Sequence, residues 1–305
     1  MTRLRVGTRG SKLALEQAGL AVAALRGVQV EVVTIKTEGD RDQQTPLRDV
    51  AGRGVFVTEI ERALAAGEVD FAVHSLKDLP TEETPGLIIA AVLERADARD
   101  AVIANDGMFL HELAPGSRVG TSSTRRAAQL RRLYPGLQPE EIRGNVETRI
   151  RKLRARDYDA IVLAVAGLSR LGRLDEATEI LSLEEMLPAP GQGAIVLQCR
   201  ASDLDTLNLL RRADHAPTRA AVTAERVVLD TLGGGCSVPV AAFARAEGQR
   251  LKLSAMAASP DGATVLEHEA PGFVADPETL GQTVAARLLA DGAADLLRDF
   301  AGVDP

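Results

Sequence analysis

The sequence predicts an α/β protein in which two similar domains precede a smaller α+β domain. Over the first two hundred residues, short apolar strands alternate with helices, which is the pattern of sheets covered by helices. Short segments recur in the same order within this region, and the alternation stops near residue 213. The 305 residues also exceed what one core usually holds, so two or three domains are expected.

The first set of elements begins with an apolar strand near the N-terminus. Ser11 is a suitable N-cap for the helix that follows, and Gly27 is a suitable end for it. Apolar and polar residues then alternate over residues 28–36, which is typical of a half-buried strand. The predicted elements of this set are strand 4–8, helix 11–26, strand 28–36, helix 56–66 and strand 69–74.

A second set of elements repeats the first. Residues 6–8 and 119–121 both read Val-Gly-Thr at the end of a strand, and buried strands begin with Asp at residues 70–73 and 159–162. The shared order of these matches predicts two similar α/β domains that face a cleft. The predicted elements of the second set are strand 118–120, a helix from residue 124 and strand 160–165.

After residue 213 the strands are grouped together, which predicts a small α+β domain. Its predicted elements are helix 218–229, strands 241–244, 251–257 and 263–269, and helix 277–289. Linkers are predicted near residues 94–99 and 187–193.

Cys236 follows three consecutive glycines at residues 233–235 and stands shortly before Pro239. Glycine loses the most conformational freedom on folding, so such a run indicates a positive φ or the close approach of a ligand to the backbone. The thiol is therefore a candidate nucleophile, metal ligand or covalent attachment point. The alternative is a turn that carries a small apolar residue.

Composition and spacing exclude several classes of protein. No apolar run reaches the length of a membrane span, and the N-terminus enters a strand pattern without a secretion signal, so a cytoplasmic location is expected. The four histidines are scattered and none stands at ligand spacing from a cysteine, so no metal site is predicted. The second cysteine, Cys199, is expected in a buried strand, without a disulfide to Cys236.

The charge is unevenly distributed along the chain. The whole chain carries −7, but residues 118–173 hold 13 basic and 5 acidic side chains, a local charge of +8. All but one of these bases are arginine, which binds a carboxylate or phosphate through two parallel hydrogen bonds. The arginines beside turns and strand ends, which are candidates for an anion site, are Arg9, Arg125, Arg126, Arg143, Arg149 and Arg170. Those expected on solvated helix faces are Arg131, Arg132, Arg151, Arg154 and Arg156.

Asp78 follows a predicted buried strand within the segment 74–80 (HSLKDLP). Ligands of open α/β sheets bind beyond the carboxyl ends of strands, so Asp78 is expected to face the arginine-rich cleft and to stay ionised. A carboxylate there would stabilise positive charge that develops on a ligand. The alternative role for Asp78 is to cap a turn.

Seven segments, in order, resemble the porphobilinogen deaminase (hydroxymethylbilane synthase) family, and the resemblance runs from about Arg5 to the C-terminus. The segments are 7–15 (GTRGSKLAL), 74–80 (HSLKDLP), 119–126 (VGTSSTRR), 143–149 (RGNVETR), 164–172 (AVAGLSRLG), 190–194 (PGQGA) and 234–239 (GGCSVP).

The resemblance implies an enzyme that joins four porphobilinogen molecules head to tail, with release of ammonia at each step, on the route to haem and related tetrapyrroles. It implies two domains like those of periplasmic binding proteins around a cleft, plus a third α+β domain, in a monomer. The implied boundaries are residues 1–95 with 194–212, residues 99–188 and residues 216–305.

By the same resemblance, Cys236 holds a dipyrromethane cofactor through a thioether, and Asp78 binds pyrrole N–H groups and stabilises azafulvenium-type cations. The implied cofactor-binding residues are Lys77, Asp78, Thr121, Ser123, Arg125, Arg126 and Arg143. The implied substrate-binding residues are Arg9, Gln17, Arg53, Ser75, Arg149, Arg170 and Gln192. Glu38 and Asp49 stand where relatives carry basic residues, so only Arg53 is assigned within the 39–54 loop.

Two other classes of protein share part of this pattern. A binding protein for a carboxylated ligand would share the cleft and the arginines, but it would not need Cys236 on a glycine loop and would usually be exported. A nucleic-acid-binding protein would use the basic segment, but 3% aromatic residues and no Trp leave little to stack on bases. The expected partner is therefore porphobilinogen, with no nucleic acid and no membrane.

Overall fold

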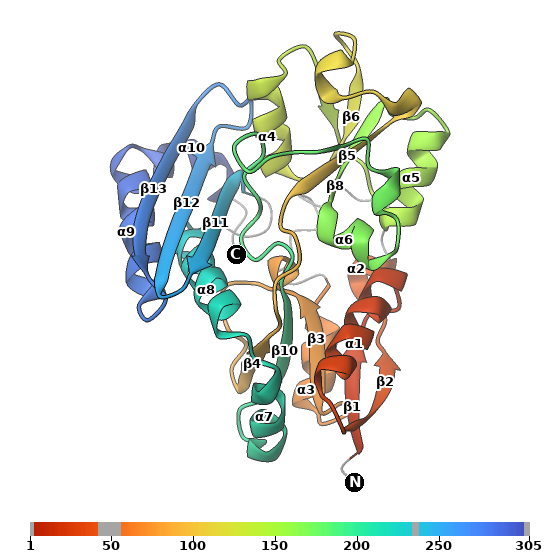
Figure 1. Ribbon diagram of the computed structural model, residues 1–305, viewed down its shortest axis with the longest axis vertical. Coiled ribbons are helices and arrows are strands. Elements are labelled where there is room, and N and C mark those ends of the chain that lie inside the picture. Colours follow the sequence, from red (N-terminus) through yellow and green to blue (C-terminus); the bar gives the residue numbers. More distant parts are fainter. Residues whose placement is uncertain (1–2, 42–55, 234–237, 302–305) are drawn as a thin grey trace.

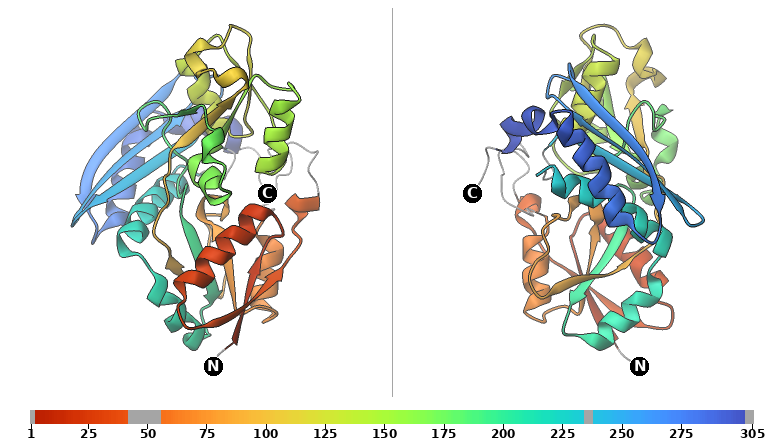
Figure 2. Two further views of the ribbon diagram at one scale, coloured as in Figure 1. Left: turned by 45° about the vertical axis from the view of Figure 1, so that its right-hand side comes forward. Right: turned by 90° about the vertical axis from the view of Figure 1, so that its left-hand side faces the viewer.

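The computed structural model describes residues 3–41, 56–233 and 238–301, and within these ranges it contains three sheets (Figure 1). The first sheet lies at the bottom of Figure 1, the second at the top, and the C-terminal sheet at the left. The rotated views agree that the C-terminal sheet lies along one side of the molecule (Figure 2). This arrangement confirms the predicted fold class of two α/β units followed by an α+β unit.

The first sheet has the strand order β2-β1-β3-β10-β4. Its middle strand β3 is parallel to β1, while β10 is antiparallel to both β3 and β4. Cys199 lies fully buried in β10, as predicted. The strands are β1 (Arg3–Thr8), β2 (Gln29–Thr34), β3 (Phe71–Ser75), β4 (Leu87–Val92) and β10 (Ile195–Arg200).

The second sheet has the strand order β7-β6-β8-β5-β9. Here β6 is parallel to β7 and β8, while β5 is antiparallel to β8 and β9. The strands are β5 (Asp100–Ala104), β6 (Arg118–Gly120), β7 (Gln138–Glu140), β8 (Ala160–Ala164) and β9 (Glu179–Ile180).

The two sheets repeat one another in atomic detail, as the recurring segments predicted. The Asp70 carboxylate accepts a hydrogen bond from the Arg5 amide (2.7 Å) at the start of β3. Asp159 accepts the equivalent bond from the Arg118 amide (2.7 Å) at the start of β8. In both sheets this Asp therefore joins the central strand to its parallel neighbour.

Helices cover the two sheets, and several begin at the side-chain caps that favour helix initiation. The Ser11 hydroxyl accepts a hydrogen bond from the Ala14 amide at the start of α1, which confirms the predicted N-cap. Ser123 and Asn145 cap α4 and α5 in the same way. The helices are α1 (Lys12–Ala24), α2 (Glu38–Arg41), α3 (Thr58–Ala65), α4 (Thr124–Leu133), α5 (Val146–Arg154), α6 (Val165–Arg170) and α7 (Leu204–Leu210). The single 3₁₀ turns are η1 (Leu76–Asp78), η2 (Asn105–Gly107), η3 (Leu110–Glu112), η4 (Leu174–Glu176) and η5 (Arg211–Ala213).

The C-terminal unit is an antiparallel sheet in the order β11-β12-β13, packed against helices. Its core is apolar and includes the fully buried Leu253 and Val284. Small residues also join it to the second unit, where Ala128 of α4 packs against Ala241 and Met256. The elements are α8 (Ala216–Thr231), β11 (Val240–Glu247), β12 (Arg250–Ala258), β13 (Val265–Phe273), α9 (Pro277–Ala290) and α10 (Ala293–Ala301).

The chain crosses between the two α/β sheets twice, after β4 and before β10. Both crossings run through the predicted linker segments, while the exact domain boundaries stay a prediction. None of the described helices is both long and apolar enough to cross a membrane.

Candidate active site

Asp78 lies directly after β3, at the end of the single turn η1. Leu76 and Leu79 anchor this turn because both are buried in one apolar cluster. The Leu79 amide also donates a hydrogen bond to the Leu76 carbonyl (3.1 Å). The half-buried Asp78 side chain is therefore held just beyond the carboxyl end of a strand, where the sequence predicted it.

Asp78 interacts electrostatically with positive side chains. Burial lowers the pKa of Arg149 to about 10, the charges of Arg126 and Arg143 add to this effect, and Asp78 opposes it. Burial also lowers the pKa of Lys77 to about 8, again with Arg126 adding to the effect and Asp78 opposing it. Because these charges act on one another, five predicted residues, Lys77, Asp78, Arg126, Arg143 and Arg149, form one electrostatic cluster.

Asp100 is a buried carboxylate that the sequence did not single out, and it holds two of the predicted arginines. It lies at the start of β5 with a side chain 0% exposed. It accepts hydrogen bonds from Arg125 (2.8 Å), Arg126 (2.6 Å) and the Gln192 amide (2.8 Å). Burial alone would raise the pKa of Asp100, but the two guanidinium charges outweigh it and hold that pKa well below its usual range. A sequence signal existed, since a charge opens an otherwise apolar strand.

Three arginines in this region each have a buried N–H group without a hydrogen-bond acceptor in the described part of the chain. Arg125 donates through Nη1 to the Leu187 carbonyl (2.6 Å), and Arg126 to the Val162 carbonyl (3.0 Å). The Nε atoms of Arg125, Arg126 and Arg170 are buried and have no hydrogen-bond partner among the described residues. A buried donor without an acceptor costs about 1–3 kcal/mol, so these atoms are candidate donors to an anionic ligand.

Gln192 links the two α/β units at this site. Its Oε1 accepts a hydrogen bond from Lys77 Nζ (3.2 Å), and its Nε2 donates to Asp100 and to the Ala98 carbonyl (2.7 Å). Arg170 reaches the neighbouring residue, since its Nη2 donates to the Gly193 carbonyl (2.7 Å). Burial lowers the pKa of Arg170 to about 10. A direct contact between Gln192 and substrate stays a prediction, because its described partners are protein atoms.

The other predicted residues lie on neighbouring elements. Thr121 is buried after β6, Ser123 caps α4, and Ser75 ends β3. Gln17 is buried on α1, and the Arg9 guanidinium lies 4.2 Å from the centre of the Phe56 ring. Two further predicted residues, Cys236 and Arg53, lie outside the described residues, as does most of the 39–54 loop.

The Arg132 and Arg156 side chains are 44% and 67% exposed, as expected of solvated positions, and Arg131 is half-buried, but each of the three also has a protein partner. Arg131 donates to the Pro260 carbonyl (2.7 Å) and Arg132 pairs with Glu267, so both join α4 to the C-terminal unit. Arg156 lies beyond the end of α5 with φ of 62°, and its side chain pairs with Asp106. The packing of separate units decided the partners of Arg131 and Arg132, and a helical pattern does not report such packing.

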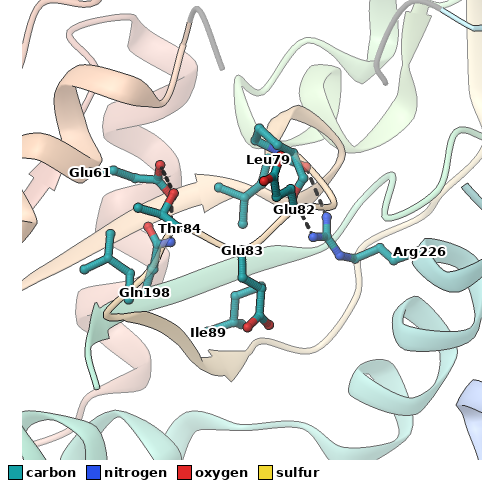
Figure 3. A pocket seen from close by; sticks show the side chains of 10 residues that line it. Glu61, Leu79, Glu82, Glu83, Thr84, Ile89, Gln198 and Arg226 are labelled. Atoms are coloured by element: carbon teal, nitrogen blue, oxygen red, sulfur yellow. Dashed lines mark hydrogen bonds between the residues drawn. The ribbon is translucent and has the colours of Figure 1, made fainter. Parts of the chain in front are cut away.

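A pocket that Leu79 and Pro80 help to line does not suit a polyanion (Figure 3). Its lining includes three carboxylates, Glu61, Glu82 and Glu83, against one guanidinium, that of Arg226. The Glu61 carboxylate accepts hydrogen bonds from the Thr84 hydroxyl (2.7 Å) and the Gln198 amide (2.7 Å), so part of the pocket lining already forms a polar network. An anionic ligand is therefore expected at the arginine cluster rather than in this pocket.

The fold and the site together define an α/β protein that gathers cationic side chains around two carboxylates, Asp78 and Asp100, a composition that suits an anionic ligand. Residues 4–208 match the family model described as porphobilinogen deaminase, dipyromethane cofactor binding domain. Residues 219–290 match the model described as porphobilinogen deaminase, C-terminal domain. The chain belongs to the porphobilinogen deaminase family.

Full-length relatives agree with this assignment. Proteins named porphobilinogen deaminase from Brevibacillus brevis and Trichlorobacter lovleyi are 47% identical over 304 residues and 48% identical over 301 residues. The first alignment covers 98% of this chain and 98% of the relative, and the second covers 97% of this chain and 96% of the relative.

Solved structures of binding proteins are similar to the chain only at a low level. A VFT2 domain of Bordetella pertussis BvgS is 15% identical, with a TM-score of 0.41 over 70% of this chain and 85% of that one. An ancestral cationic amino acid solute binding protein is 17% identical, with a TM-score of 0.42 over 68% of this chain and 86% of that one.

Proposed function

We propose that this chain joins four porphobilinogen molecules head to tail into hydroxymethylbilane, with release of ammonia at each step. The observation that carries the proposal is family membership over nearly the whole chain, at 47–48% identity. The family activity is that of a transferase in tetrapyrrole biosynthesis. Porphobilinogen bears an acetate and a propionate, so a growing chain of such units matches the cluster of arginines around Asp78.

We further propose that the dipyrromethane cofactor is attached through a thioether to Cys236. The cysteine stands five positions after Thr231, the last residue of α8. When bound, the cofactor supplies the free pyrrole position that the first substrate unit extends. The described residues fit such a group, because the unpartnered Nε donors of Arg125 and Arg126 suit its carboxylates.

The cofactor and substrate roles divide among the remaining residues as the resemblance implies. Carboxylates of the cofactor are assigned to Lys77, Thr121, Ser123, Arg125, Arg126 and Arg143. Carboxylates of the substrate are assigned to Arg9, Gln17, Arg53, Ser75, Arg149, Arg170 and Gln192. The cytoplasmic location and the monomeric state are likewise proposals drawn from the family.

In this proposal Asp78 is the catalytic residue. Departure of ammonia leaves positive charge on the substrate, and an ionised carboxylate beside that position stabilises the charge as it forms. Lys77 and Arg149 belong to the same cluster, since the charge of Asp78 acts on both. Lys77 is assigned to carboxylates of the cofactor and Arg149 to those of the substrate, so one cluster both binds the polyanion and places the Asp78 carboxylate.

The cofactor proposal is tested by intact mass. Purified protein should carry the mass of two linked pyrrole units without any added cofactor, and Cys236→Ser should lack it. Cys199→Ser is the matched control and should keep the added mass, because Cys199 is buried in β10. Active wild-type protein at its bare polypeptide mass would refute the attachment.

The role of Asp78 is tested by Asp78→Asn, which keeps the shape of the side chain and removes its charge. Turnover should fall by at least about 100-fold, which is typical of losing a positioned electrostatic group, while the free energy of unfolding hardly changes. A turn cap would behave in the opposite way, with a loss of about 1 kcal/mol in stability and retained turnover. Steady-state kinetics and urea unfolding of the same preparation distinguish the two outcomes.

A further inference from the structure

Helix α8 packs against two different parts of the molecule. One face joins the core of the C-terminal sheet through four side chains, Ala221, Ala224, Val228 and Leu232, the last just beyond the helix end. Another face carries Val222, which is buried in one cluster with Leu76 and Leu79. Those two leucines flank the Asp78 turn, so α8 lies between that turn and the C-terminal sheet.

Arg226 adds polar contacts one turn further along the same face as Val222. Its guanidinium donates to three consecutive backbone carbonyls, those of Leu79 (3.1 Å), Pro80 (2.7 Å) and Thr81 (3.3 Å). Figure 3 shows this side chain reaching from α8 to the segment. The bonds cross 145 to 147 residues of sequence and end immediately after Asp78.

The segment that follows Asp78 depends on these bonds. Residues 79–81 belong to no strand or helix, so their carbonyls have no ladder to join, and Pro80 has no N–H to offer one. A planar guanidinium presents several donors in a fixed arrangement, which suits a row of adjacent acceptors better than a single ammonium does.

We infer that Arg226 is a positioning residue, which fixes the Asp78 carboxylate relative to α8 and the C-terminal sheet. The inference rests on the proposed role of Asp78. Because α8 holds the Asp78 turn through Val222 and Arg226 and is itself packed into the C-terminal core, the turn is tied to that core. Loss of Arg226 would let the Asp78 turn shift while the C-terminal core kept α8 in place.

The chain offers a matched control on the same helix. Arg219 lies two turns before Arg226, pairs with Asp214 (2.8 Å) and donates to the Ala90 carbonyl (3.0 Å) of β4. It therefore also joins α8 to the first sheet by a guanidinium-to-carbonyl bond, but not next to Asp78. A general loss of packing between α8 and the first unit would appear in both variants.

The experiment compares Arg226→Gln with Arg219→Gln in the full-length holoenzyme. Arg226→Gln should lower kcat by about 10- to 100-fold, since a misplacement of about 1 Å at a reacting centre costs up to about 100-fold. KM and the mass of the bound cofactor should stay unchanged. Arg219→Gln should leave kcat unchanged. Arg226→Lys keeps one donor group, so its kcat should lie between those of wild type and Arg226→Gln. If Arg226→Gln does not fold, the kcat of Arg226→Lys tests the inference instead.

A double-mutant cycle shows whether Arg226 acts through Asp78. With Asp78→Asn already present, Arg226→Gln should lower kcat by less than about threefold, because the charge it positions is gone. Equal losses in both backgrounds would overturn the inference, as would unchanged kcat in both the Gln and Lys variants. Loss of the cofactor from Arg226→Gln would also overturn it. Failure of the Asp78 role itself is seen separately, in the turnover of Asp78→Asn alone.

Discussion

The buried carboxylate of Asp100 makes a sharp prediction about stability. Asp100→Asn keeps the size of the side chain but removes the charge that faces Arg125 and Arg126, whose side chains are 3% and 7% exposed. Removing one partner of a buried pair costs about 3–5 kcal/mol, since it leaves uncompensated charge without water. Two guanidiniums lose their shared anion here, so the upper part of this range is expected.

A neighbouring aspartate provides the control. Asp97 pairs with Arg99 (2.6 Å), but their side chains are 35% and 43% exposed. Exposed pairs contribute about 0–1 kcal/mol, so Asp97→Asn should be nearly neutral. Urea unfolding of both variants at neutral pH measures the difference, and intact mass shows whether both carry the same bound cofactor.

The pH dependence supplies a second measurement. The pKa of Asp100 is lower in the folded protein than in the unfolded chain, so its stabilising contribution is complete above about pH 4 and is lost as the pH falls towards the folded value. The difference in the free energy of unfolding between wild type and Asp100→Asn should therefore narrow as the pH is lowered from about 5 to 3. An Asp100→Asn protein within about 1 kcal/mol of wild type at neutral pH would refute the reasoning.

Two further predictions concern the cations of the site. Arg125→Leu and Arg126→Leu should yield protein without dipyrromethane, because a buried cofactor carboxylate left unpaired costs on the order of 2–5 kcal/mol. Arg9→Leu and Arg170→Leu should carry the cofactor but stall during elongation or show a raised KM. Intact mass after limited substrate separates these outcomes, and normal elongation in all four variants would contradict the assignment. For Lys77, whose pKa is lowered to about 8 in the fold from 10.5, the unfolded chain binds the extra proton between these values, so the free energy of unfolding of cofactor-free protein should rise with pH across that interval. Lys77→Met should lack this rise when urea unfolding is measured across the same pH interval. An equal pH dependence of the free energy of unfolding in both proteins would contradict the prediction.

Local signals in the sequence predicted many elements because their causes are local. The start of α1 depends on one Ser11 hydroxyl and an amide three residues away. Strands β7 and β9 were not predicted, since they have three and two residues and show no periodicity. They exist because a neighbouring strand offers partners for their backbone groups.

The site divides in the same way. Asp78 and its arginines were predictable from turn residues, strand ends and the seven family motifs. Asp100 was not, because its meaning depends on Arg125 and Arg126, 25 and 26 residues away on another element. In the sequence alone, Asp100 is only a polar residue at the start of an apolar strand, because the sheet that brings it to the two arginines cannot be seen there.

The sequence by itself determined the family and the order of most elements, and it predicted the residues proposed to bear the chemistry, since motifs, caps and periodicity act among neighbours in the chain. Only the tertiary structure decided which of these residues support one another. Lys77 meets Gln192 across 115 residues, and Arg226 meets Pro80 across 146. Such contacts depend on how two sheets and α8 pack, which is a sum of many weak apolar contacts that no short segment encodes.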